Sequence, residues 1–302
     1  MDNKKFVEII EFTDPACTWC WGSEPILRKL ETHFEGNIEV NFIMGGLVKD
    51  IRNFRDDLND IGGDTSDVNA QVASHWSEAS ERHGMPVEAK GFSLFSEEAP
   101  STYPMNIAYK AAQFQSDVLA KKFLRRIREA VETEARKANQ IEVLIELAGE
   151  CGLDIAKFIK SFSDGTAEKA FQEDLKLTSS YRVHGFPSFL VKSSDGKEIM
   201  LRGYQSFDTF KAVIDQITNG ELSPKNIDKT EENIMSFIKK YKRVTTFEIS
   251  TVFELPKVEL EETLQSLERQ KSIRIIPAGN GYFVTPGSDP LSCDPITGIC
   301  NI

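Results

Sequence analysis

The sequence predicts an α/β fold, because two groups of β-strand patterns enclose a long stretch in which only helical periodicity occurs. Strand patterns at residues 6–12 and 38–44 flank an amphipathic helix pattern. Strand patterns at residues 188–192 and 198–202 are followed by a further amphipathic helix. A βαβ unit and a ββα unit therefore combine into a two-layer domain over residues 1–220.

A helical insertion is expected inside this domain, at about residues 53–182, where strand patterns are absent. Amphipathic stretches at residues 108–131 and 140–151 are typical of it, and Gly152 is placed to end the second stretch. The predicted sheet is therefore assembled from segments that lie far apart in the chain.

A second, smaller domain is predicted at residues 225–286, after a linker that contains Ser223 and Pro224. Three short helix patterns precede two strand-like segments that flank a Gly-Asn-Gly turn. This order indicates a winged-helix-like domain. Residues 287–302 form a cysteine-containing tail that we expect to be flexible.

Composition and charge restrict the classes of partner. The chain has 302 residues, 40% of them hydrophobic, and a formal net charge of -11, which disfavours nucleic acid and anionic membranes. The third C-terminal helix pattern, residues 257–270, carries two basic and four acidic side chains, so DNA binding is not expected unless the basic cluster at 239–243 docks instead. We expect this domain to bind a partner protein or to form a homodimer.

The cytoplasm is the expected compartment. The N-terminal segment lacks the apolar core of a secretory signal, and no apolar run approaches the roughly 20 residues that span a bilayer. The chain contains five cysteines, and an odd number argues against a structural disulfide framework.

The motif Cys17-Thr18-Trp19-Cys20 stands where a loop enters the first predicted helix. The free N–H groups of a helix N-terminus favour a thiolate, which makes Cys17 the predicted nucleophile. Cys20 lies one turn later, within reach to form a disulfide with Cys17 and to release a partner from a mixed disulfide. Zinc ligation is the alternative interpretation, but the sequence offers no second close-spaced pair, so no metal is predicted.

Three segments resemble the DsbA-type thioredoxin-fold family, in particular its cytosolic FrnE-like branch. They are Glu11-Phe12, residues 17–22 (CTWCWG) and residues 183–189 (VHGFPSF). The resemblance covers about residues 5–220. It implies a thioredoxin-like fold with a helical insertion, and a dithiol reaction on protein or small-molecule thiols and disulfides that needs no dissociable cofactor.

The resemblance also assigns roles to single residues. It implies that Pro187 is cis and lies against the active-site disulfide, and that Phe186 faces the substrate. It places Glu11 beneath the disulfide, where a buried carboxylate of raised pKa could move the proton of Cys20; the alternative is an exposed charge at a strand end. Trp19 is predicted to face the substrate.

The dipeptide Thr18-Trp19 lacks the histidine of the family's best-known periplasmic oxidant. Without that imidazolium the Cys17 thiolate is less stabilised and the disulfide is less oxidising, so we expect a reductase or isomerase.

The remaining cysteines divide into two groups. Cys293 and Cys300 lie in the tail and are interpreted either as an auxiliary dithiol that exchanges with the first pair or as unused thiols. Cys151 lies in an apolar helix pattern and is predicted to be buried and inert.

Two other functions are consistent with the resemblance. One is a protein-binding adaptor on the same scaffold, for example one that delivers a partner to a protease, and the appended C-terminal domain motivates it. The other is a kappa-type glutathione-dependent isomerase, which the cysteine at position 17 disfavours because those proteins typically carry serine there.

Overall fold

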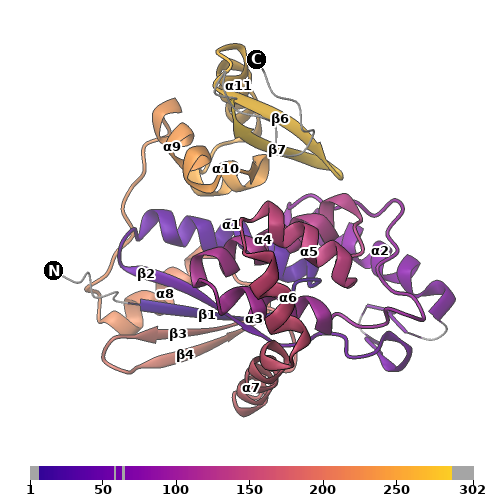
Figure 1. The fold of residues 1–302 in the computed structure, drawn as a ribbon. Helices are drawn as coiled ribbons and strands as arrows, with labels where there is room; N and C mark the ends of the chain where they lie inside the picture. Colours follow the sequence, from indigo (N-terminus) through magenta and orange to yellow (C-terminus); the bar gives the residue numbers. More distant parts are fainter. Residues whose placement is uncertain (1–6, 58, 63–64, 288–302) are drawn as a thin grey trace.

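The computed structural model describes residues 7–57, 59–62 and 65–287, and its centre is a four-stranded mixed sheet in the order β2-β1-β3-β4 (Figure 1). β1 pairs in parallel with β2 and antiparallel with β3, and β3 pairs antiparallel with β4. The strands are Val7–Thr13, Ile38–Met44, Ser188–Ser193 and Glu198–Arg202. The strands predicted from the βαβ and ββα patterns are thus present.

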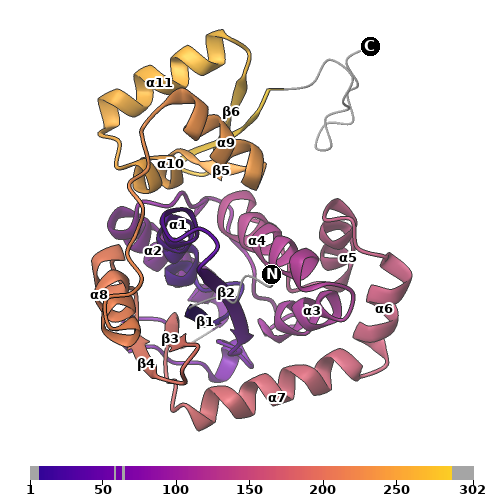
Figure 2. The ribbon, with the colours of Figure 1, turned by 90° about the vertical axis from the view of Figure 1, so that its left-hand side faces the viewer.

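Helices cover both faces of this sheet. α1 (Thr18–His33) and α8 (Phe207–Thr218) pack on one face, over apolar side chains such as Ile9 and Val191. The other face carries Phe12 and Leu190 and is covered from the side of α7 (Thr166–Ser180). Figure 2 shows α8 and α7 on different sides of the strands.

The segment between β2 and β3 is helical, as predicted. It contains η1 (Ile51–Asn53), α2 (Thr65–His83), α3 (Tyr103–Gln113), α4 (Asp117–Glu134), α5 (Ile141–Glu150), α6 (Ile155–Ser163) and α7. The stretch at 108–131 is two helices rather than one. Ser116 adopts an extended conformation and its hydroxyl caps α4 by accepting a hydrogen bond from the Leu119 N–H, while the apolar periodicity continues across the turn.

The C-terminal elements follow the predicted order of three helices and a hairpin. They are α9 (Glu231–Tyr241), β5 (Val244–Thr245), α10 (Thr246–Phe253), α11 (Lys257–Arg269), β6 (Ile273–Ala278) and β7 (Gly281–Pro286). Their strands form a small sheet in the order β5-β7-β6 over a separate apolar core. The two-residue strand β5 is too short for a periodic pattern to reveal.

The C-terminal elements are docked on the rest of the molecule. α10 packs on α1, and the β6–β7 turn approaches the loop after α2 (Figure 1). The Asn280 side-chain oxygen accepts a hydrogen bond from the Val87 N–H at 2.9 Å. Gly279 has φ +52, and a Cβ there would lie 2.2 Å from the Val87 carbonyl oxygen, so this close approach requires glycine.

Residues 288–302, which contain Cys293 and Cys300, lie outside the described residues. Within the described part of the chain, no helix has the length and apolarity needed to cross a bilayer.

Candidate functional site

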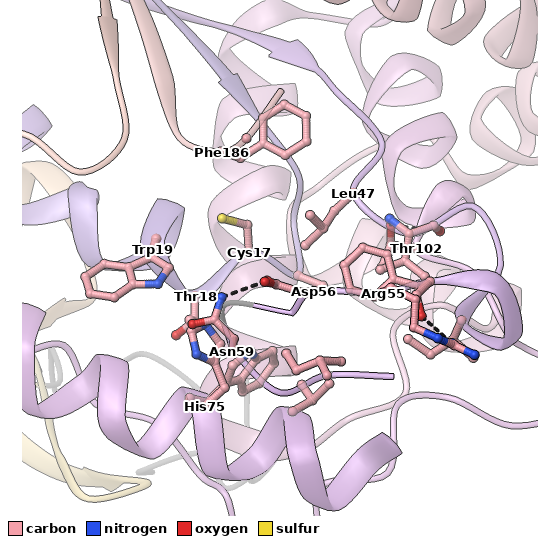
Figure 3. Close-up of a pocket in the computed structure, with 18 of the residues that line it drawn as sticks. Cys17, Thr18, Trp19, Leu47, Arg55, Asp56, Asn59, His75, Thr102 and Phe186 are labelled. Carbon is pink, nitrogen blue, oxygen red and sulfur yellow. Dashed lines mark hydrogen bonds between the residues drawn. The ribbon is translucent and has the colours of Figure 1, made fainter. Parts of the chain in front are cut away.

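Cys17 is the N-cap of α1, at the end of the short loop that follows β1. Its Sγ accepts a hydrogen bond from the Cys20 N–H at 3.3 Å, so the free N–H groups of the helix point at the sulfur. Only 5% of the residue is exposed, and its sulfur opens on a cavity (Figure 3). This environment suits a thiolate nucleophile of restricted access.

The buried carboxylate of Asp14 fixes the loop that carries Cys17. It accepts hydrogen bonds from the Ala16 N–H at 2.9 Å, the Leu47 N–H at 2.7 Å, the Thr102 hydroxyl at 2.8 Å and the Asn106 side-chain amide at 2.8 Å. Burial raises its pKa, and these four donors oppose the rise. The sequence interpretation missed this residue, although an Asp-Pro pair just before the motif is a typical turn signal.

Cys20 and Glu11 lie together beneath Cys17 and are fully buried. Burial raises the pKa of the Cys20 thiol well above its usual range, and the nearby Cys17 and Glu11 raise it further. Burial also raises the pKa of Glu11 to about 7, against the opposing charge of Arg128. Glu11 is therefore not an exposed strand-end charge, and its carboxyl can exchange a proton near neutral pH.

Arg128 of α4 organises the carboxylates below the dithiol. Its guanidinium donates hydrogen bonds to Glu11 at 3.3 Å, to the Thr13 hydroxyl at 2.5 Å and to Glu24 of α1 at 2.5 Å. Although burial raises the pKa of Glu24, Arg128 and two neighbouring arginines lower it overall. The sequence interpretation missed Arg128, because it stands 117 residues after Glu11.

A chain of buried ion pairs continues from this group to the C-terminal elements. Arg125 lies 3.4 Å from Glu24 and 2.7 Å from Glu248 of α10, and Arg28 lies 3.0 Å from the same Glu248. Glu248 also closes a capping box with Thr245 at the start of α10. Consecutive charged contacts thus join the carboxyl beneath Cys20 to the C-terminal elements.

A cavity of about 700 Å³ adjoins Cys17. Figure 3 shows the Cys17 sulfur between Trp19 and Phe186. The Phe186–Pro187 bond is cis, Pro187 is buried, and Phe186 is half-buried in the cavity wall. The wall combines apolar and polar side chains and includes Leu47, Ile51, Phe54, Arg55, Asp56, Asp57, Asn59, His75, Trp76 and His184.

Gly45 provides the space for Phe186. A Cβ at Gly45 would lie 2.1 Å from the Phe186 ring, a distance at which one of the two must move. The absence of a side chain at Gly45 therefore sets the position of a cavity-lining aromatic ring.

Trp19 is half-buried and lines the cavity, with its ring 5.7 Å from His83 and 5.9 Å from Tyr204. Trp21 instead is fully buried and donates a hydrogen bond to the Pro86 carbonyl at 2.8 Å. The structure therefore gives the two tryptophans different surroundings, one at the cavity and one in the core.

Cys151 is buried at the C-cap of α5, and burial raises the pKa of its thiol to about 11. It is remote in sequence and environment from the dithiol. Among the described residues, no group of three or more histidine, cysteine or acidic side chains is arranged to hold a metal ion.

A family model described as thioredoxin matches residues 11–212, which include Glu11, Cys17, Cys20 and the Phe186–Pro187 pair. The chain belongs to the thioredoxin family. This thioredoxin-family protein is similar in fold to the cytosolic disulfide reductase DsbM from Pseudomonas aeruginosa, with a TM-score of 0.53 and 21% identity over 70% of this chain and 98% of that one. It is similar in fold to a 2-hydroxychromene-2-carboxylate isomerase, with a TM-score of 0.51 and 14% identity over 72% and 99% of the two chains.

Similarity in sequence extends over nearly the whole thioredoxin-family chain. The ClpXP adapter protein SpxH of Halalkalibacterium halodurans is 27% identical over 283 residues, which are 93% of this chain and 89% of that protein. The SpxH protein of Bacillus subtilis is 25% identical over 284 residues, with the same coverage. These comparisons confirm the predicted DsbA-type thioredoxin fold, and the FrnE-like branch stays a prediction.

Proposed function

We propose that the protein is a cytoplasmic thiol–disulfide oxidoreductase that reduces or isomerises disulfides of proteins or small thiols. One observation carries the proposal: the Cys17 sulfur stands at a helix N-cap and opens on a cavity, while Cys20 lies buried beneath it beside Glu11. An attacking sulfur that opens on a cavity and a resolving sulfur shielded from it are what two-step exchange requires.

The reaction follows from this arrangement. The Cys17 thiolate attacks one sulfur of a substrate disulfide, forms a mixed disulfide and expels the other sulfur as a thiolate. Cys20 then loses its proton to the Glu11 carboxylate, attacks the Cys17 sulfur and expels the second substrate thiolate. The substrate gains two electrons and the protein is left with a Cys17–Cys20 disulfide. We place the substrate in the cavity that Trp19 and Phe186 line, beside the cis bond that joins Phe186 to Pro187.

Insulin reduction tests this function. We expect Cys17→Ser to abolish turnover, and Cys20→Ser to accumulate a mixed disulfide, because the attacking thiol remains without its resolving partner. Cys151→Ser is the control, since that thiol is buried and outside the site. Undiminished turnover in Cys17→Ser would refute the proposal, and the double variant Cys293→Ser/Cys300→Ser shows in the same assay whether the tail cysteines are used.

A second candidate is a protein-binding adaptor, favoured by the name of the SpxH relatives, ClpXP adapter protein. We propose that the C-terminal domain at residues 225–286 is the partner-binding or dimerising part. It exposes Val258 by 67% and Tyr282 by 52%, and it is held on the thioredoxin part by buried charges.

An experiment with purified ClpX and ClpP distinguishes the two proposed functions. The adaptor function predicts that a Cys17→Ser/Cys20→Ser double variant still accelerates degradation of a bound partner protein by the protease. Loss of partner binding in that variant, together with mixed disulfides in Cys20→Ser, supports redox capture instead.

A further inference from the structure

A second carboxyl is buried near the dithiol. Glu132 of α4 is fully buried, and neither of its carboxyl oxygens has a hydrogen-bond partner among the described residues. It stands four residues after Arg128 and so lies on the same side of the helix, the side that reaches α1. A buried carboxylate without partners costs several kcal/mol, so its presence calls for an explanation.

The groups that face Glu132 come from α1 and α4. They are the sulfur of Cys17 and the hydroxyl of Thr18 at the start of α1, and the guanidinium of Arg128. Burial and the negative charge of a Cys17 thiolate raise the pKa of Glu132 well above its usual range, while Thr18 and Arg128 oppose the rise. The carboxyl therefore holds its proton more tightly when Cys17 is a thiolate.

His83 of α2 is the next titratable group in this direction, and it stays neutral. The Met85 N–H donates to its Nδ1 at 3.1 Å, so the ring hydrogen is on Nε2, which lies 3.4 Å from the Thr18 hydroxyl. Burial, and secondarily His75, lower the pKa of His83 to about 4. An imidazolium at this position is thus not available to stabilise a Cys17 thiolate at neutral pH.

We propose that Glu132 is the proton partner of Cys17. When the Cys17 thiol ionises, its proton passes to the Glu132 carboxylate, so that the thiolate and a neutral carboxylic acid form together and the total charge of the pair stays at minus one. Glu11 serves Cys20 in the same way on the other side of Arg128. Each thiol of the dithiol then has its own buried carboxyl.

This inference rests on the proposed dithiol chemistry and fixes its proton balance. Two-electron reduction of the Cys17–Cys20 disulfide breaks the S–S bond and takes up two protons, one on the Cys20 sulfur and one on the Glu132 carboxylate, while Cys17 remains a thiolate. Oxidation forms the S–S bond, passes two electrons to the oxidant and releases both protons.

The number of protons taken up on reduction tests the assignment. The equilibrium between the Cys17–Cys20 disulfide and a reference redox couple is measured over a pH series in which Cys17 is a thiolate, after correction for the reference's own protons. For two protons the equilibrium constant changes about 100-fold per pH unit, and for one proton about tenfold. We expect about 100-fold in the wild type and about tenfold in Glu132→Gln.

Glu129→Gln is the matched control. Glu129 is also a buried acidic residue of α4, but it pairs with Arg125 at 2.8 Å and with Arg243 at 3.5 Å instead of facing the dithiol. This variant should keep the wild-type dependence. Glu11 titrates in the wild type and in both variants, so the difference between the wild type and Glu132→Gln reports Glu132 alone.

Infrared difference spectra of the wild type give an independent readout that needs no variant to fold. Reduction should produce the carbonyl band of a newly protonated carboxyl, and alkylation of Cys17 should remove it. Equal proton counts in the wild type and Glu132→Gln, or no such band, would overturn the role of Glu132. Failure of Cys17 and Cys20 to form a reversible disulfide at all would instead refute the proposed oxidoreductase function.

Discussion

Replacement of Glu11 by glutamine should stabilise the protein at neutral and alkaline pH while it impairs the reaction. The carboxyl is fully buried at the centre of the sheet, and burial raises its pKa from 4.5 to about 7 even with Arg128 beside it. Keeping this group ionised therefore costs folding stability. Glutamine has nearly the same shape and does not ionise, so it removes this cost.

The size and sign of the effect follow from the pKa. The difference of about 2.5 pKa units, 7 minus 4.5, corresponds to about 3 kcal/mol. Because the folded state binds the proton more tightly, the stability that Glu11 contributes is complete below about pH 4.5 and is lost as the pH rises through about 7. Glu11→Gln should equal the wild type at pH 4 and exceed it by about 3 kcal/mol at pH 8.

Urea unfolding at pH 4 and pH 8 measures this difference. Glu24→Gln is the control of opposite sign: its pKa is lowered overall by arginines, so this variant should lose stability at pH 8, and the loss should fade as the pH falls. A Glu11→Gln effect that is the same at both pH values would refute the reasoning. Glu11→Gln should also resolve mixed disulfides more slowly, because Cys20 has lost its proton acceptor.

Two further substitutions test the cavity and the docked C-terminal elements. Gly45→Ala should displace Phe186 and lower kcat/KM for insulin by roughly tenfold, while kcat/KM for a small disulfide substrate should be nearly unchanged. Gly149→Ala is the control: its Cβ would meet nothing closer than 3.8 Å, so neither kcat/KM should change. Glu248→Gln removes the charge that pairs with two buried arginines, although glutamine can still cap α10. Chemical denaturation should therefore show a loss of about 3 kcal/mol, against almost none for the exposed Glu259→Gln.

The fold was predictable because its signals are local. Two β-rich runs, residues 6–12 and 188–192, locate two central strands to within a residue or so, because each run is rich in β-branched and aromatic residues. The break between α3 and α4 was not predictable from periodicity, because apolar positions continue across residues 114–116 and only the Ser116 cap marks the turn.

The candidate site was predictable only in part. Cys17 and Cys20 are close in sequence, so their spacing alone indicates dithiol or metal chemistry. Arg128 and Glu132 reach the site from α4 through contacts that span more than 100 residues, and no local pattern encodes such a contact. One signal was present in the sequence: two charged residues four apart on a helix whose neighbours Ile127 and Val131 are core residues.

The buried ion pairs give the two proposed functions a common physical basis. When Glu248 loses its charge, Arg125 interacts more strongly with Glu24. The interaction of Glu24 with Arg128 is weakened as a result. Arg128 then favours the ionised form of Glu11 more strongly, and because these groups are buried, dissolved salt screens the effect little.

Glu248→Gln should therefore shift the pH dependence of mixed-disulfide resolution to lower pH, in the direction that a partner protein would produce by pulling α10 away from α1. The profile is measured by following release of a thiol from the Cys17 mixed disulfide over a pH series. If the pH profile of Glu248→Gln coincides with the profile of Glu259→Gln, the ion pairs hold the C-terminal elements in place but do not affect the dithiol. A shift shows that binding at the C-terminal elements and exchange at Cys17 are thermodynamically linked, so that each must influence the other.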